Sequence, residues 1–430
     1  MLGILCDIIE SNKTAIAGAS LLVLFLSYYL IEVAKVIIII KLVIDKLSTQ
    51  TSRYNNVLDM LRSRYIYLFI SLKLRRPRLI CGDVEFREFL ESGLPVLKDR
   101  VWSTPWCFEA RMQTVFAGLL RTLILPKAIW SRELLTLADG GTVALQWAPA
   151  AANQRGVLVL LPGLAGAADA DYLRLLRAAA DRARLRAVVL LPRGRHAPLT
   201  SARLYSAVSH ADVGEVLHAL HERGHRPLLA AGVSLGALLL ANHMAEWGDR
   251  CVLSGALLLS APLDVPACAR QLQRGASERA MSRMLAASLK RTLEGLPSLH
   301  AQAGVGWRSA RSLREFDATF TAPHCGFSHV DDYYSAANAA DCLSAVRVPL
   351  LALSAADDPL QPERVLPLDQ FSRSRRTALA LTARGGHIGF MTGWWPSRDP
   401  SRHFVSRVAE QYFVAILRWQ NSTTQPEKHP

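Results

Sequence analysis

Short apolar runs alternate with helical patterns along the middle of the chain. Each run has the length of a strand and is bounded by turn or polar residues; the runs occupy residues 157–161, 187–191, 227–231, 252–260, 348–354 and 376–382. Stretches between them, such as residues 212–223 and 237–246, have the spacing of helices. Uninterrupted apolar runs are typical of parallel strands that are buried on both faces. The alternation therefore predicts an α/β fold, with a doubly wound, mostly parallel sheet between helices.

One strand-to-helix turn contains a serine between two glycines. Gly232, Ser234 and Gly236 form a Gly-x-Ser-x-Gly motif that follows an apolar run and precedes a helical stretch. A serine on such a turn is exposed as a nucleophile elbow, and the glycines avoid collisions that side chains would cause. The motif alone occurs often by chance, so the prediction of a nucleophile depends on an acid and a histidine elsewhere in the chain.

An acid and a histidine follow in the chain order of the α/β-hydrolase fold, which is serine, acid, histidine. Asp357 and Asp358 come directly after one apolar run, and His387 lies in a glycine-rich loop after the next. Loops at the carboxyl ends of parallel strands meet at one edge of the sheet. We therefore expect Ser234, Asp358 and His387 to form a catalytic triad. Asp358 is favoured because it begins an Asp-x-x-x-Pro pattern, whereas Asp357 is expected to cap the following helix.

The loop after the run 157–161 is predicted to complete the site. It reads Pro-Gly-Leu-Ala-Gly, with Leu164 in its centre. In this fold one N–H of that loop and the N–H of the residue after the nucleophile bind the oxyanion. We expect the amides of Leu164 and Leu235 to form this oxyanion hole, where each donor contributes about 10²–10³ in turnover. The chain has no His-Glu-x-x-His and no paired Cys-x-x-Cys, so we expect no metal site and no cofactor.

The alternation of strands and helices stops between about residues 262 and 345. Helix formers dominate there, most clearly at residues 270–293. Hydrolases of this fold carry a lid at this position, which shapes the pocket and controls the access of water. We expect residues 131–420 to form the hydrolase domain, with a lid at about 262–345. Residues 76–130 are expected to precede the domain, and residues 421–430 to be a tail.

Several segments of the chain resemble the membrane-anchored α/β-hydrolase-domain family, which includes bacterial relatives of the YheT type. The resemblance extends over about residues 101–417 and is greatest to the subgroup of α/β-hydrolase-domain proteins 1 and 3. The matching segments are residues 106–114, 138–141, 161–166, 230–236, 312–317, 330–334 and 385–390. The chain departs from the family at Ala237, where a third glycine is usual, and before Arg193, where an asparagine is frequent. Neither change removes a group that carries a proton, although the first is expected to tighten the surroundings of the nucleophile.

The resemblance implies a serine hydrolase of membrane-lipid esters, and we expect a phospholipase that acts on phosphatidylcholine. A monoacylglycerol lipase, a carboxylesterase or an acyltransferase are alternatives of related chemistry; the lack of a His-x-x-x-x-Asp motif weighs against the last. A non-catalytic lipid-binding or scaffold protein is the alternative of another class, and the intact triad argues against it. The expected partners are a phospholipid or another acyl-ester lipid and the bilayer. Acyl-chain length, headgroup, sn position and oligomeric state stay open.

The N-terminal part of the chain has a different character. Residues 14–31 are uncharged and mostly apolar, and apolar residues continue to residue 40. A helix over residues 14–40 is long enough to cross about 30 Å of hydrocarbon, and no small-residue cleavage site follows it. We expect residues 1–75 to hold a transmembrane signal anchor and a juxtamembrane segment. The protein would then be a single-pass membrane protein of the endoplasmic reticulum or another endomembrane. The basic residues after the span favour a cytosolic catalytic domain, whereas relatives are described with the opposite orientation, so the orientation stays open.

Composition and charge exclude several other classes. The chain has 430 residues, half of them hydrophobic, which is enough for a large core in one domain with an extension. Its net charge of +14 has no nucleic-acid-binding module to accompany it, so we expect no nucleic-acid partner. Seven scattered cysteines indicate mostly free thiols. No Gly-x-Gly-x-x-Gly follows a strand, which argues against a nucleotide-dependent oxidoreductase.

Overall fold

The structure of the protein is a computed structural model. It describes residues 74–424, except for residues 105, 108, 165, 195–196, 202, 297–298 and 300–305. The described residues all lie in one compact unit, Ser71–Pro430.

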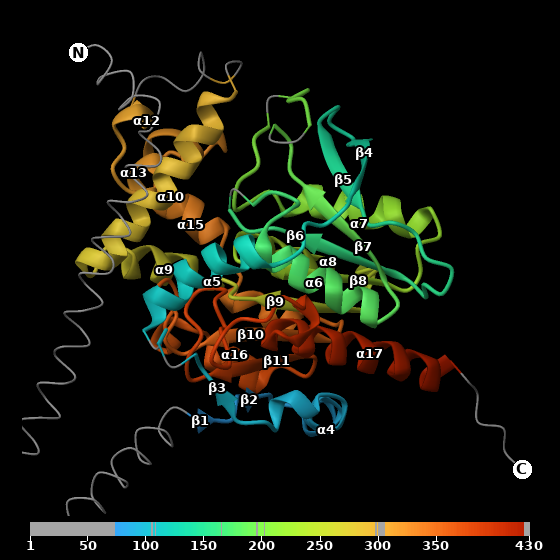
Figure 1. Ribbon diagram of the computed structural model, residues 1–430. Helices are drawn as coiled ribbons and strands as arrows, with labels where there is room; N and C mark the ends of the chain where they lie inside the picture. The colour runs from blue at the N-terminus through green and yellow to red at the C-terminus, as the bar shows by residue number, and fades with distance from the viewer. Residues whose placement is uncertain are drawn as a thin grey trace, which may run out of the picture. The chain divides into compact units, whose positions relative to one another are not determined.

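A nine-stranded sheet runs through this unit in the order β2-β11-β10-β9-β8-β6-β7-β5-β4 (Figure 1). The strands are β2 (Arg78–Ile80), β4 (Ser131–Thr136), β5 (Thr142–Trp147), β6 (Val157–Leu161), β7 (Arg186–Leu191), β8 (Leu228–Val233), β9 (Gly255–Leu259), β10 (Leu350–Ala355) and β11 (Thr377–Thr382). The six strands β6 to β11 all pair with one another in parallel. At one edge of the sheet β2 pairs antiparallel with β11, and at the other edge β5 pairs antiparallel with β7 and with β4. Each of the parallel strands coincides with one of the predicted apolar runs. The prediction of a doubly wound, mostly parallel α/β sheet is therefore confirmed.

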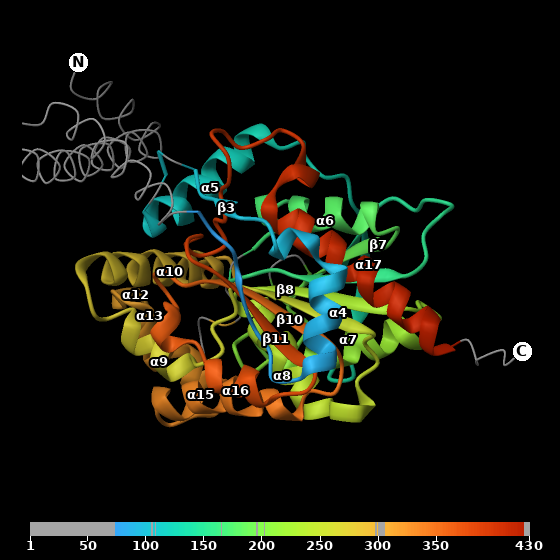
Figure 2. The ribbon, with the colours of Figure 1, turned by 90° about the horizontal axis from the view of Figure 1, so that it is seen from below.

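Helices cover both faces of the sheet, which explains why the parallel strands have no polar side (Figures 1 and 2). Alternate strand residues belong to two separate apolar clusters, so that Leu158 and Leu160 face one layer while Val157 and Val159 face the other. The first layer contains α4 (Val84–Gly93), α6 (Asp171–Arg182) and α17 (Phe404–Thr424). The second contains α7 (His210–Glu222), α8 (Leu235–Trp247) and α16 (Leu368–Arg373). Burial on both faces is the arrangement that a parallel sheet requires.

The segment before β4 is part of the same unit. Its β1 (Leu74–Arg75) pairs with β3 (Val101–Trp102), and β2 extends the main sheet beside β11. A 3₁₀ turn, η1 (Pro95–Leu97), follows α4, and a fifteen-residue helix, α5 (Ala110–Ile124), leads to β4. Residues 76–130, which the sequence predicts to precede the hydrolase domain, thus supply strand β2 of the main sheet and two helices, α4 and α5, that contact the domain.

The predicted lid lies between β9 and β10 and is helical. It contains α9 (Val265–Gln271), α10 (Ala276–Glu294), α12 (Gly306–Ser309), α13 (Leu313–Phe316), the π-helix η3 (Asp317–Thr321), α14 (Ala322–His324), α15 (Val330–Ala336) and the 3₁₀ helix η4 (Ala340–Ala345). The expected helix over residues 270–293 is wrong at its start, because α9 ends at Gln271 and α10 begins at Ala276. Gly275 precedes α10 as its N-cap in an extended conformation, so a turn separates the two helices.

Short 3₁₀ helices occupy three loops outside the lid: η2 (Gly248–Arg250), η5 (Glu363–Val365) and η6 (Pro400–Arg402). The last helix, α17, extends to Thr424, into the region expected to be a tail. Six cysteines lie among the described residues, and all are free, as the sequence predicts. In the described part of the chain, no helix combines the length and the apolar character needed to cross a membrane. The predicted anchor at residues 14–40 lies outside the described residues.

Candidate active site

Ser234 lies on the sharp turn between β8 and α8, as the motif predicts. Its φ angle is +52°, which is unusual for a residue other than glycine and is typical of a nucleophile elbow. The two flanking glycines allow the turn to pack closely. A Cβ on Gly232 would lie 2.5 Å from the Cα of Ala237, and one on Gly236 would collide with the carbonyl oxygens of Leu161 and Pro162. The glycines are therefore required by the space available, and the elbow fixes the direction of the serine.

The structure brings together the three side chains that the sequence analysis selects. Nε2 of His387 lies 3.0 Å from Oγ of Ser234, and Nδ1 lies 2.8 Å from Oδ2 of Asp358. The Asp358 side chain is fully buried, and that of His387 is 9% exposed. In the tautomer in which Nδ1 donates to Asp358, Nε2 accepts the hydroxyl hydrogen of Ser234. This is the arrangement in which a serine hydroxyl can lose its proton to an imidazole.

The two candidate aspartates have different partners. Oδ1 of Asp358 accepts hydrogen bonds from the amides of Leu360 and Gln361, which leaves Oδ2 directed at His387. Oδ1 of Asp357 accepts from the amide of Gly386 in the histidine loop, at 3.0 Å. Burial raises the pKa of the Asp357 carboxyl, and the amide hydrogen bond opposes that effect. The expectation that Asp357 caps a following helix is wrong, because the residues after it form a loop and its carboxylate connects the acid loop to the histidine loop.

Two backbone amides lie where an oxyanion hole is expected. Leu164 and Leu235 both line the pocket that contains Ser234. Within the described residues, neither amide has a hydrogen-bond acceptor. Leu235 is the first residue of α8, where an N–H group has no partner inside the helix and the helix dipole favours negative charge. The loop after β6, which contains Leu164, is held by Tyr172, whose hydroxyl accepts a hydrogen bond from the amide of Gly163 at 3.1 Å.

Helix α5 supports the histidine loop, which the sequence analysis did not foresee. Oγ1 of Thr114 accepts from the amide of His387 at 2.9 Å and donates to the carbonyl of Ala110. The buried guanidinium of Arg121 donates to the carbonyls of Ile388 and Gly389, at 3.1 Å each. The loop needs this support because Ile388 has a φ of +65°, a conformation that costs a branched residue free energy.

The same contact explains two glycines of the histidine loop. A Cβ on Gly386 would collide with the carbonyl oxygen of Ala110, and one on Gly389 would lie 2.7 Å from that of Gln113. The backbone of α5 therefore packs directly on the loop. The segment 106–114, which the sequence marks only by its resemblance to a family, contains two of these contact residues.

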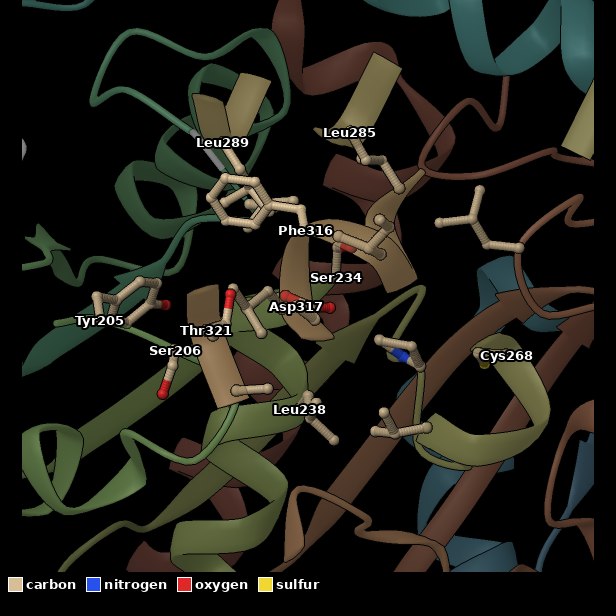
Figure 3. Close-up of a pocket in the computed structure, with 18 of the residues that line it drawn as sticks. Tyr205, Ser206, Ser234, Leu238, Cys268, Leu285, Leu289, Phe316, Asp317 and Thr321 are labelled. Carbon is tan, nitrogen blue, oxygen red and sulfur yellow. The ribbon is translucent and has the colours of Figure 1, made fainter. Parts of the chain in front are cut away.

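An apolar pocket opens over Ser234, with a volume of about 400 Å³. The lid supplies much of its wall, including Leu285 and Leu289 of α10 and Phe316 of α13 (Figure 3). Leu238 of α8 lies on the opposite side of Ser234 in the same view. A pocket of this size with few polar groups suits an acyl chain, and it also limits the access of water to the serine.

The pocket wall contains one buried carboxyl group, that of Asp317 in the π-helix η3 (Figure 3). Its Oδ2 accepts from the hydroxyl of Tyr334 at 2.9 Å. Burial raises the pKa of Asp317 to about 6, although the hydrogen bonds from Thr321 and Tyr334 oppose that effect. Asp317 and Tyr334 belong to the two lid segments, 312–317 and 330–334, that resemble the family, and their hydrogen bond joins these segments.

Cys268 is the one cysteine among the described residues that line the pocket. Burial raises the pKa of its thiol, and the nearby Asp358 adds to that effect. A thiol that keeps its proton is a poor nucleophile, so Ser234 is the group equipped for attack. Among the described residues, no cluster of three or more His, Cys, Asp or Glu side chains is placed to hold a metal ion.

Comparison of the sequence with known proteins identifies relatives along most of the chain. Phospholipase ABHD3 of Homo sapiens is 31% identical over 364 residues, which cover 82% of this chain and 88% of the relative. Phospholipase ABHD3 of Mus musculus is 32% identical, with 82% and 87% covered. Putative esterase YheT of Escherichia coli (strain K12) is 32% identical over 306 residues, with 68% and 89% covered. The chain belongs to this family of α/β-hydrolase-domain carboxylic-ester hydrolases. The predicted resemblance is thereby confirmed, although no protein-family model matches the chain.

Solved structures of esterases also resemble the chain. An esterase of Pyrobaculum calidifontis aligns with a TM-score of 0.44 and 14% identity, covering 78% of this chain and 92% of that one. Est1E from Butyrivibrio proteoclasticus aligns with a TM-score of 0.43 and 10% identity, covering 67% and 99%. The assignment of the α/β-hydrolase fold rests on the strand order and the family membership.

Proposed function

We propose that this protein is a serine phospholipase that hydrolyses the acyl esters of phosphatidylcholine in membranes, through an acyl-enzyme on Ser234. The observation that carries the proposal is the continuous chain of short contacts from Ser234 through His387 to Asp358 at the base of an apolar pocket. The names of the relatives, phospholipase ABHD3 among them, support the choice of a phospholipid as substrate.

The reaction would begin when Oγ of Ser234 attacks the ester carbonyl and its proton passes to Nε2 of His387. Asp358 would hold the imidazole through Nδ1 and stabilise its charged form. The amides of Leu164 and Leu235 would donate to the negative oxygen of the tetrahedral intermediate. Collapse of that intermediate breaks the bond to the alcohol, and the proton on His387 goes to the leaving lysophospholipid.

The second half of the reaction would release the fatty acid. Water attacks the acyl-enzyme and gives a proton to His387, which returns it to Oγ of Ser234 as the acyl–serine bond breaks. Only residues of this chain and water take part, so no cofactor is needed for the reaction. The lid would cover the acyl chain during these steps, because Leu285, Leu289 and Phe316 line the pocket around Ser234.

The activated serine is tested by labelling the detergent-solubilised full chain with a fluorophosphonate probe. We expect the wild type to be labelled, and Ser234→Ala and His387→Ala to lose the label. Ser92→Ala is the matched control, because Ser92 is exposed on α4 and bonds only to the carbonyl of Phe89. A Ser234→Ala variant that is labelled like the wild type would contradict the mechanism.

The substrate is tested separately, with the wild type in mixed micelles. We expect release of fatty acid from phosphatidylcholine, and none from the Ser234→Ala variant. Hydrolysis of monoacylglycerol or of short soluble esters, with no release from phosphatidylcholine, would favour a monoacylglycerol lipase or a carboxylesterase. A folded wild type that is neither labelled nor active would favour a lipid-binding role.

We also propose that residues 14–40 anchor the chain in the membrane, because residues 14–31 are uncharged and mostly apolar and only Glu32 and Lys35 carry charge in the rest of the range. The full chain should stay in the membrane pellet after extraction with alkaline carbonate. Leu22→Arg together with Leu24→Arg, in the middle of the uncharged stretch, should release it. Extraction of the wild-type chain by carbonate would contradict the anchor.

A further inference from the structure

A group of large apolar side chains is exposed on one side of the catalytic unit. We call this group the α5 surface; it consists of Val115, Leu119 and Leu123 of α5, Trp102 of β3, and Trp394 and Trp395 of the loop after β11. These side chains are between 44% and 72% exposed. The three residues of α5 lie four positions apart, so they form a single stripe along the helix. A contiguous exposed apolar patch on a soluble face marks a place of interaction.

Contacts join the parts of the α5 surface into one patch. Trp106 packs against Phe116 of α5 with an edge contact of 6.2 Å, and against Trp395 at 5.5 Å between ring centres. Its indole nitrogen donates to the carbonyl of Trp394 at 2.7 Å. The amide of Gly393, the residue before Trp394, donates to the carbonyl of Trp102 at 3.1 Å. The helix, the loop and the β3 strand are thus fastened to one another through tryptophans.

The α5 surface borders the mouth of the pocket. Thr114, next to Val115 on α5, lines the pocket, and so does Met284 of α10, which is 65% exposed. The pocket therefore reaches the molecular surface at α10. An ion pair of 3.0 Å between Arg111 of α5 and Glu278 of α10 holds the two helices together. Helices α5 and α10 and strand β3 lie on the same side of the molecule in both views (Figures 1 and 2).

The charge of these segments is of one sign. Residues 110–124, 126–130 and 391–398 contain no aspartate or glutamate, and Lys127 and Arg398 are exposed among them. Exposed tryptophans together with basic residues are characteristic of surfaces that lie in the headgroup region of a bilayer.

The N-terminal part of the chain enters the described unit at this same place. Strand β1 (Leu74–Arg75) pairs with β3, with Leu74 opposite Trp102. The 73 residues before it include the apolar stretch 14–40 that we propose as the membrane anchor. In the sequence, 33 residues (41–73) separate the proposed anchor from strand β1, which pairs with β3 of the α5 surface.

We propose that the α5 surface binds the surface of the bilayer, with the tryptophans and the α5 stripe in contact with lipid and the basic residues facing anionic headgroups. The mouth of the pocket is then held against the membrane, and an acyl ester can pass from the bilayer to Ser234 without crossing water. The inference rests on the proposed lipid substrate. It adds a defined docking surface on the catalytic unit, independent of the anchor.

The kinetic test uses the full chain reconstituted in vesicles of phosphatidylcholine with some phosphatidylserine. Leu119→Asp combined with Leu123→Asp should lower the rate on vesicle phosphatidylcholine by about tenfold or more, because two leucines lose apolar contact with lipid. The rate on a water-soluble short-chain ester should stay unchanged. Leu134→Asp is the matched control, since Leu134 is half exposed on edge strand β4, and its rates on both substrates should match the wild type. An unchanged rate on vesicles, or an equal loss on both substrates, would overturn the proposal.

A second readout needs no activity. Brominated lipids in the vesicles should quench the tryptophan fluorescence of the wild type, and Trp394→Phe with Trp395→Phe should remove most of that quenching. Equal quenching in the variant, or none in the wild type, would overturn the proposal that the α5 surface binds the bilayer. Either result would favour an α5 surface that is covered by another part of the chain or by another protein. Failure of the proposed phospholipase function would give a different result from failure of the docking proposal: the wild type would release no fatty acid from phosphatidylcholine even in mixed micelles.

Discussion

Replacing Asp317 by asparagine should stabilise the protein more at pH 8 than at pH 5. Asp317 is buried in the lid and accepts a hydrogen bond from Tyr334. Asparagine has nearly the same shape, and its carbonyl can accept the same hydrogen bond. It differs from aspartate in that it does not carry a charge at any pH. The substitution therefore removes the cost of ionising a buried carboxyl while it keeps the contact to Tyr334.

The magnitude follows from the pKa of Asp317, which burial raises from 3.8 to about 6. Between these values the folded state holds a proton that the unfolded state has lost. The free energy of unfolding therefore decreases as the pH rises through this window, and it is constant above it. The total loss is about 3 kcal/mol, of which about 1.5 kcal/mol is lost by pH 5. The advantage of Asp317→Asn over wild type should then grow by about 1.5 kcal/mol between pH 5 and pH 8.

Urea unfolding of the detergent-solubilised full chain, followed by tryptophan fluorescence at both pH values, measures this difference. Asp331→Asn in the same lid is the control. Its carboxylate is exposed and pairs with Arg314, which lowers the pKa of Asp331, so the substitution should give no advantage that grows with pH. An Asp317→Asn variant whose stability relative to the wild type is the same at pH 5 and pH 8 would refute the reasoning.

Three further predictions test the site and its support. Asp358→Asn should lower kcat on a soluble ester by about 10⁴, whereas Asp357→Asn should retain most of it, because only Asp358 bonds to the imidazole; equal losses would contradict the assignment. Arg121 forms an ion pair of 2.8 Å with Asp171 of α6. Arg121→Met should lower the free energy of unfolding by about 3–5 kcal/mol in a urea titration, since it leaves the buried Asp171 carboxylate without its cation. Gly236→Ala should abolish fluorophosphonate labelling through its clash with backbone oxygens, while Gly118→Ala on α5, where a Cβ meets nothing within 4 Å, should label like the wild type.

The sequence predicts the sheet well because a buried parallel strand has a simple signature. Strand β6 matches its apolar run at both ends, and β10 and β11 differ from theirs by no more than two residues at either end. Each of these strands is buried along its entire length, so that nearly every position is apolar, and Ser354, Thr377 and Thr382 are the exceptions. The positions of Ser234, Asp358 and His387 could be predicted for the same reason. Each follows the carboxyl end of such a strand, and the carboxyl ends of parallel strands lie at one edge of the sheet.

The parts that the sequence did not predict depend on contacts between distant segments. Thr114 reaches the amide of His387 across 273 positions, and no local pattern announces such a bond. Arg193 and Asp139 are similar: Asp139 lies in a segment that resembles the family and Arg193 follows a departure from it, and only the structure shows that the buried Arg193 pairs with Asp139 at 2.7 Å. The break between α9 and α10 contains Gly275, a poor helix former, but a single glycine within a helical pattern does not fix where a helix ends, and tertiary packing of the lid decides where the chain turns.

Helix α5 buries two polar side chains beside Met112 and Ala117 on its inner side and exposes large apolar residues on its outer side, which is unusual for an amphipathic helix. Arg121 and Gln113 are buried, where the first holds the histidine loop and the second accepts the amide of Met391. The stripe that ends at Leu123 faces outward. A stripe of exposed apolar side chains marks a place of interaction, and the proposed docking to a bilayer would cover it. Because the two functions lie on opposite faces of one helix, the outer face can lose its contact with lipid while the loop of His387 keeps its position.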